Sequence, residues 1–77
     1  MSLIPLVTEY LRGIGYKMPT SPVLLAILED PWVVMESTLN DKLALDLGPI
    51  KIVIYINRKV EVVHEAKVTT IQSESQK

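Results

Sequence analysis

The sequence predicts an α+β domain with two N-terminal helices packed on one face of a three- to four-stranded antiparallel β meander. Two patterns support this class: apolar residues recur at helical spacing over residues 3–14 and 23–28, and they mostly alternate with polar residues over residues 32–68. At 77 residues the chain is short enough for one domain, which we expect to span residues 1–70. We expect residues 71–77 to form a frayed or disordered polar tail, because they have little to bury.

The first helix is expected near the N-terminus, where apolar residues follow the i, i+3, i+4, i+7 spacing of one helical face. These residues are Leu3, Leu6, Val7, Tyr10, Leu11 and Ile14. Ser2 can cap the start of this helix, and the run Gly13-Ile14-Gly15 supplies glycines whose left-handed conformation can end it. Arg12 is the only basic residue on the polar side, so we favour core packing over binding to a membrane surface.

A second helix is expected to begin at Pro22. Ser21 is a favoured capping residue, and proline is favoured in the first helical position. Residues 23–28 are almost all apolar, which predicts a largely buried helix. Pro31 should end it, because proline cannot continue a helical hydrogen-bond ladder.

The pattern changes after Pro31, and residues 32–39 alternate in the way that predicts a strand. A further strand over residues 43–47, joined to the first by a three-residue loop, keeps apolar residues opposite apolar residues. The pair Gly48-Pro49 then marks either a tight turn or a bulge within one long strand, because proline cannot donate to a central ladder.

The most strongly specified segment is residues 50–56. In a strand its four isoleucines share one side, while Lys51, Val53 and Tyr55 share the other. A strand that is apolar on both sides is typical of one covered on both faces. We expect a chain of this length to need a second copy to cover both faces, with an unusually well packed monomer as the alternative.

A hairpin should join this segment to a second alternating run, residues 60–68. A three-residue loop over residues 57–59 keeps apolar residues opposite one another and pairs Ile56 with Val60. This register places the basic pair Arg58-Lys59 at the hairpin tip.

Once helices cover the isoleucine side, an apolar patch remains on the reverse of the sheet, and such patches usually mark interaction sites. Chains under about 80 residues often rely on disulfides, metals or oligomerisation, and this one has no cysteine and one histidine. We therefore expect a non-enzymatic protein-interaction module (an adaptor, inhibitor or assembly subunit). It would act as a homodimer or higher closed oligomer, joined by the patch or by edge pairing of the last strand. Another protein is the alternative partner. The expected interface residues are Val34, Val53, Tyr55 and Val63.

The alternative function is a small DNA-binding regulator that uses the Arg58-Lys59 hairpin as a wing. Two observations weigh against nucleic acid as a partner. The formal net charge is −1, so no basic surplus steers the protein toward phosphate. The second helix also lacks the polar and basic side chains that a recognition helix needs.

His64 is the single histidine, the residue type most used for acid–base chemistry near neutral pH, so an enzyme would be centred there. Strand alternation directs Glu65 away from it. We therefore expect an interior or edge histidine, no catalytic residues and no enzymatic activity.

We also expect no metal and no cofactor. One histidine without cysteine cannot supply the usual zinc ligands, and Asn40-Asp41 is too sparse for a calcium loop. Gly13-Ile14-Gly15 lacks the third glycine and the preceding strand of a dinucleotide-binding turn.

The N-terminal segment has no basic leader. Glu9 and Arg12 interrupt its apolar run before the length of a signal peptide or a membrane span. We expect a cytoplasmic (intracellular) protein that does not enter the membrane.

Overall fold

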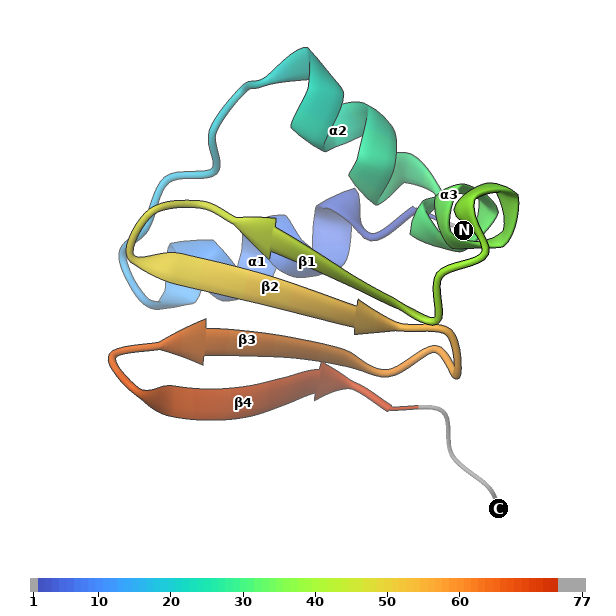
Figure 1. Ribbon diagram of the computed structural model, residues 1–77. Coiled ribbons are helices and arrows are strands. Elements are labelled where there is room, and N and C mark those ends of the chain that lie inside the picture. Colours follow the sequence, from blue (N-terminus) through green and yellow to red (C-terminus); the bar gives the residue numbers. More distant parts are fainter. Residues whose placement is uncertain (1, 74–77) are drawn as a thin grey trace.

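The computed structural model describes residues 2–73, which form three helices followed by a four-stranded antiparallel sheet (Figure 1). The elements are α1 (Ile4–Gly13), α2 (Pro22–Glu29), α3 (Pro31–Thr38), β1 (Lys42–Asp46), β2 (Ile50–Tyr55), β3 (Val60–His64) and β4 (Lys67–Gln72). The strands lie in the order β1-β2-β3-β4, so each is hydrogen-bonded to its neighbour in sequence. The predicted α+β class, with N-terminal helices and an antiparallel meander, is confirmed.

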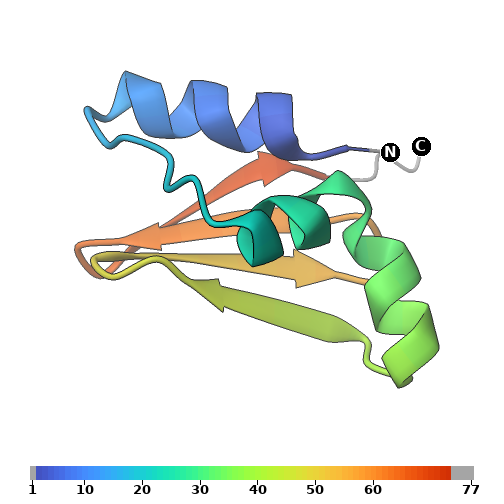
Figure 2. The same cartoon turned by 90° about the horizontal axis from the view of Figure 1, so that it is seen from above.

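The helices and the sheet form two layers. Figures 1 and 2 show α1 running along one face of the sheet, with α2 and α3 continuing toward β1. Between the layers lies a core of buried side chains: Leu3, Val7, Leu11, Leu24, Leu28, Trp32, Met35, Ile50, Ile52, Ile54, Val60 and Val62. The prediction that the isoleucines of residues 50–56 face the helices is therefore correct for Ile50, Ile52 and Ile54. It is wrong for Ile56, which lies in the turn after β2 and is 43% exposed.

The helix ends follow the local signals in the sequence. Ser21 caps α2, where its Oγ accepts from the main-chain N–H of Leu24 at 3.4 Å. At α1 the capping position is Leu3 rather than the predicted Ser2, although Ser2 Oγ accepts from the N–H of Ile4 at 3.2 Å. After α1 the chain reverses through Gly15, whose φ is +79°, and the N–H of Tyr16 donates to the Leu11 carbonyl at 2.8 Å.

Residues 31–38 form the helix α3, so the predicted strand over residues 32–39 and its hairpin with residues 43–47 are wrong. Pro31 ends α2 and also occupies the first turn of α3, where its missing N–H costs nothing. Trp32 and Met35, three residues apart, are both buried against the sheet layer. A short apolar run of this length fits both the 3.6-residue period of a helix and the two-residue period of a strand, and tertiary packing decides between them.

The Gly48-Pro49 pair forms a tight turn between β1 and β2, which resolves the choice between a turn and a bulge. Gly48 has a φ of +94°, and its N–H donates to Asp46 Oδ1 at 2.9 Å. The N–H of Leu47 donates to the Ile50 carbonyl at 2.8 Å and closes the turn.

The β2–β3 hairpin exists, but its register differs from the prediction by two residues. Val60 pairs with Ile54 rather than with Ile56. The N–H of Tyr55 donates to the Lys59 carbonyl at 2.8 Å, so the loop is residues 56–58, and Arg58 is left-handed at φ 75°. A left-handed third residue is common in three-residue hairpin loops. A shift of two residues keeps every side chain on its predicted face.

The predicted strand over residues 60–68 is two strands joined by a turn at Glu65-Ala66. Both turn residues have positive φ, 54° and 64°, as a two-residue type I′ turn requires. The second strand, β4, includes Ile71 and Gln72, although the sequence predicts that both belong to the polar tail. Ile71 packs against the core, and Gln72 Nε2 donates to the Arg58 carbonyl at 3.1 Å. Residues 74–77 of the predicted tail lie outside the described residues.

Candidate interaction surface

The reverse face is the side of the sheet that turns away from α1, which lies behind the strands in Figure 1. Its apolar residues are Ala44, Val53, Tyr55, Val63 and Val68. Val68 is 57% exposed, and Val53 and Val63 are half-buried by strand neighbours alone. Three of the predicted interface residues, Val53, Tyr55 and Val63, therefore lie on one face as expected from alternation.

Val34, the fourth predicted interface residue, belongs to α3 and has no place in the register of this face. Its carbonyl accepts hydrogen bonds from Ser37 Oγ at 3.1 Å and Thr38 Oγ1 at 2.8 Å. Its assignment to the sheet is wrong for the same reason as the strand over residues 32–39. Ala44 was missed although it alternates with Leu43 and Leu45, whereas the face of Val68 follows only from the β3–β4 turn and pairing.

Charged residues alternate with the apolar residues of the reverse face in a definite order. The pairings arrange this face in three rows across the strands: Lys42 and Tyr55; then Ala44, Val53, Glu61 and Thr70; then Asp46, Lys51, Val63 and Val68. Lys42 and Asp46 thus lie at opposite ends of β1 on the same face.

Tyr55 is held on this face by Glu61 and Lys59. Tyr55 Oη donates to Glu61 Oε1 at 3.0 Å, and Lys59 Nζ lies 3.1 Å from Glu61 Oε2. The hydrogen bond to the Glu61 carboxylate raises the pKa of Tyr55, because it stabilises the neutral phenol. Hydrogen bonds from Lys59 and then from Tyr55 lower the pKa of Glu61. The phenol ring is therefore presented in one orientation.

The basic pair of the hairpin is engaged within the chain. The Arg58 guanidinium lies 4.6 Å from the centroid of the Trp32 ring, a cation–π distance. Lys59 precedes β3 and contacts Glu61, and its Nζ lies 5.6 Å from the centre of the Tyr55 ring. Arg58 lies in the hairpin loop as predicted, whereas Lys59 lies at its base. These contacts hold the two cations against α3 and β2 rather than extending them from a free wing.

His64 lies at the end of β3, opposite Ile50, and is half-buried. Its Nε2 is 4.0 Å from Glu65 Oε2, closer than strand alternation predicts, because Glu65 belongs to a turn. This distance is beyond a hydrogen bond. The nearby cavity, of about 220 Å³, is lined by Tyr10, Ile14, His64, Glu65, Lys67 and Thr69. It brings no oriented nucleophile and base together.

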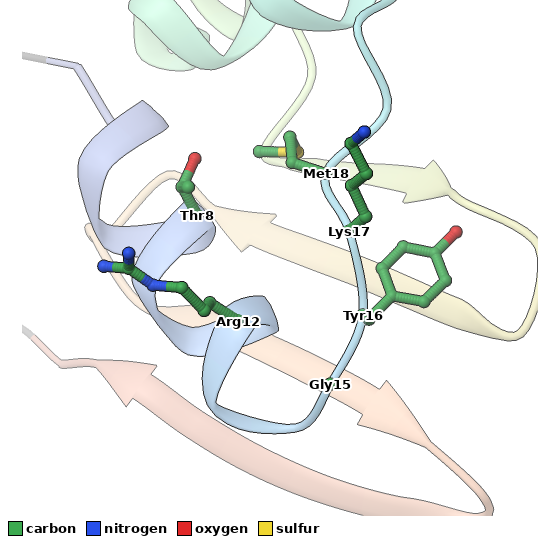
Figure 3. Close-up of a pocket in the computed structure, with 6 residues that line it drawn as sticks. All are labelled: Thr8, Arg12, Gly15, Tyr16, Lys17 and Met18. Carbon is green, nitrogen blue, oxygen red and sulfur yellow. The ribbon is translucent and has the colours of Figure 1, made fainter.

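An open groove of about 470 Å³ lies between α1 and the connector to α2 (Figure 3). It is lined by Thr8, Arg12, Gly15, Tyr16, Lys17 and Met18. Arg12 pairs with Glu9, and Tyr16 Oη donates to the Leu47 carbonyl at 2.5 Å, on the other side of the connector from Thr8 and Arg12. The groove is therefore lined by the apolar Met18 and by Lys17, which has no ion pair in the part of the chain that the structure describes, and it holds no set of groups arranged for catalysis.

Within residues 2–73, no three His, Cys, Asp or Glu side chains gather closely enough to hold a metal ion. None of the helices in that part of the chain has both the length and the apolar character needed to cross a bilayer. Comparisons with protein families, with curated proteins and with solved structures found no match for this chain.

Proposed function

We propose that the protein is a non-enzymatic interaction module that self-associates through the reverse face. One observation carries this proposal: the helices cover only one face of the sheet, and the other presents valines from β2, β3 and β4. Covering this face with a second copy would remove apolar surface from water at about 25 cal/mol per Å². For Val68, which is 57% exposed, the gain is about 1–2 kcal/mol.

The size of the face sets the expected affinity. Neighbouring strands lie about 4.8 Å apart and rise about 3.3 Å per residue, so a sheet of four five-residue strands has a face of roughly 19 by 17 Å. Stable specific interfaces bury about 800 Å² of accessible surface on each partner, and this face supplies less. We therefore expect a dissociation constant in the micromolar range rather than an obligate dimer.

The proposal is tested by sedimentation equilibrium of the full chain from micromolar to millimolar concentration. We expect a reversible monomer–dimer equilibrium. The substitution Val68→Lys places a charge on the reverse face and should weaken the dimer by at least about tenfold. Val23→Lys is the matched control, because Val23 is 70% exposed but lies on α2, outside this face. It should leave the equilibrium unchanged.

Three results would contradict the proposal. A wild-type chain that stays monomeric at the highest concentration would remove self-association. Equal dissociation constants for Val68→Lys and Val23→Lys would show that the dimer does not form through the reverse face. A dimer that persists in Val68→Lys would indicate pairing through a free sheet edge, that of β1 or β4, instead. Circular dichroism of each variant checks that the fold is retained.

A further inference from the structure

The charges of the reverse face are placed so that the face complements itself. On β1, Lys42 and Asp46 lie two residues to either side of Ala44 and share its face. Lys42 is paired across the sheet with Tyr55, and Asp46 with Lys51. A positive charge and a negative charge therefore mark the two ends of the same strand.

Closed dimers are related by a twofold axis, and two copies packed face to face need that axis in the plane of the interface. The axis can then run along the strands or across them. Each direction sets a different group of side chains opposite one another, so the register of the sheet discriminates between them.

An axis along the strands, between β2 and β3, exchanges these two strands. Val53 would lie over Glu61 of the second copy, because the two residues are directly paired in the sheet. Lys51 would lie over Val63 of the second copy for the same reason. The same rotation exchanges β1 with β4, so Asp46 would lie over Val68 of the second copy and the charges of β1 would meet no opposite charge.

An axis across the strands, through Ala44 and Val53, reverses the ends of each strand. Lys42 then lies over Asp46 of the second copy, and the pair occurs twice by symmetry. Val53 lies over its own copy, and Tyr55 over Lys51 of the other. Glu61 also faces its own copy, and Val63 lies over Lys59 of the other copy, but Glu61 and Lys59 are already paired with each other at 3.1 Å within each chain.

The row through which the axis across the strands passes is also restricted by the charges. Moving it to the row of Asp46 and Lys51 would set each of these charges against an identical one, and Lys42 would no longer lie over Asp46 of the second copy. Packed sheets lie about 10 Å apart with strands within about 30° of each other, a gap that lysine and aspartate side chains can span together.

We infer that two copies pack face to face about a twofold axis across the strands, with Lys42 of each copy paired with Asp46 of the other. This inference rests on the proposed self-association. It adds the geometry and the residues that make the second copy of this chain the specific partner.

A charge-exchange experiment tests the pairing. In Lys42→Glu, two attractive pairs become two repulsive ones, so the dimer should weaken by at least about tenfold. Asp46→Lys should weaken it similarly. An equimolar mixture of the two variants restores opposite charges at both positions, and sedimentation should show a heterodimer of near wild-type affinity. A mixture no stronger than either variant alone would overturn the inference.

Cross-linking gives a second test that does not require the Asp46 substitution, which removes the oxygen that accepts from the N–H of Gly48. The chain has no cysteine, so single cysteines can be placed freely. With a short bismaleimide, Val53→Cys, on the axis, should cross-link to itself faster than Val63→Cys, one row away. The reverse order would overturn the inferred axis. If both cross-link poorly while wild type dimerises, the face proposal also fails; if wild type is monomeric, the proposed function itself fails.

Discussion

The indole Nε1 of Trp32 donates a hydrogen bond to the main-chain carbonyl of Tyr55 at 2.9 Å. The same carbonyl accepts the N–H of Arg58 at 3.0 Å, and the Arg58 guanidinium lies over the indole ring. One carbonyl at the end of β2 thus joins α3 to the β2–β3 hairpin. This junction holds in place the helix that the sequence pattern did not predict.

Trp32→Phe should lower the free energy of unfolding by about 1–2 kcal/mol, because it removes the hydrogen bond and some buried surface. Urea unfolding followed by circular dichroism measures this change. Val33→Ala, at the next residue, alters an exposed side chain of the same helix and should stay within about 0.5 kcal/mol of wild type. Equal losses in the two variants would contradict an anchoring role for Trp32.

Leu39→Gly should stabilise the protein by about 0.5–1 kcal/mol, because strain from the left-handed backbone exceeds the entropy cost of glycine. Leu39 ends α3 with a φ of 57° and is 93% exposed, so little packing is lost. Thermal or urea unfolding provides the measurement. A lower stability would show that the Leu39 side chain makes contacts important to the folded state.

The same substitution, alanine to glycine, should have opposite effects at two exposed positions. Ala66 has a φ of 64° in the β3–β4 turn, so Ala66→Gly should raise the free energy of unfolding by about 1 kcal/mol. Ala26 lies inside α2, where glycine costs about 1 kcal/mol, so Ala26→Gly should lower it. Urea unfolding of both variants decides the matter, and effects of equal sign would refute the left-handed turn.

Removing the Glu61 carboxylate should change the acid side of the stability profile. The pKa of Glu61 is lowered in the folded protein, so its contribution is present above the ordinary value of 4.5 and is lost as the pH falls below it. The stability difference between wild type and Glu61→Gln should therefore be constant near neutral pH and shrink in acid. A difference that is independent of pH would contradict the Lys59–Glu61–Tyr55 network.

The alkaline side should respond to Tyr55. Its pKa is raised above 10.0 by the hydrogen bond to Glu61, so the stabilisation is present below that pH and is lost as the pH rises through the folded value. Tyr55→Phe should abolish this alkaline loss, as followed by urea unfolding at several pH values. Tyr10→Phe is the control, since Tyr10 lies on α1, and should retain the loss.

We expect no binding to random duplex DNA at physiological salt, because Arg58 and Lys59 are engaged with Trp32, Tyr55 and Glu61. Mobility-shift titration over a range of salt concentrations checks this. A salt-dependent complex that disappears in Arg58→Gln would restore the winged-hairpin alternative.

Local signals in the sequence were sufficient for several elements. Ser21-Pro22 places the start of α2, and Gly15 ends the turn after α1, because capping and positive φ depend on a few adjacent atoms. Alternation assigned Val53, Tyr55 and Val63 to one face, and this assignment survives a register error of two residues. The predicted part of the candidate surface therefore comes from strand periodicity alone.

Tertiary structure decided the rest. Residues 31–38 are helical because Trp32 reaches the Tyr55 carbonyl, a group 23 residues away that no local pattern specifies. The Glu65-Ala66 turn contains neither glycine nor asparagine, and pairing of β3 with β4 imposes its positive φ. For these reasons Val68 lies on the reverse face, which the sequence did not predict, and Val34 does not. The sequence by itself determined which side chains share a face within β2 and β3 and where α1 and α2 start, whereas long-range packing determined that residues 31–38 are helical and how the strands are aligned.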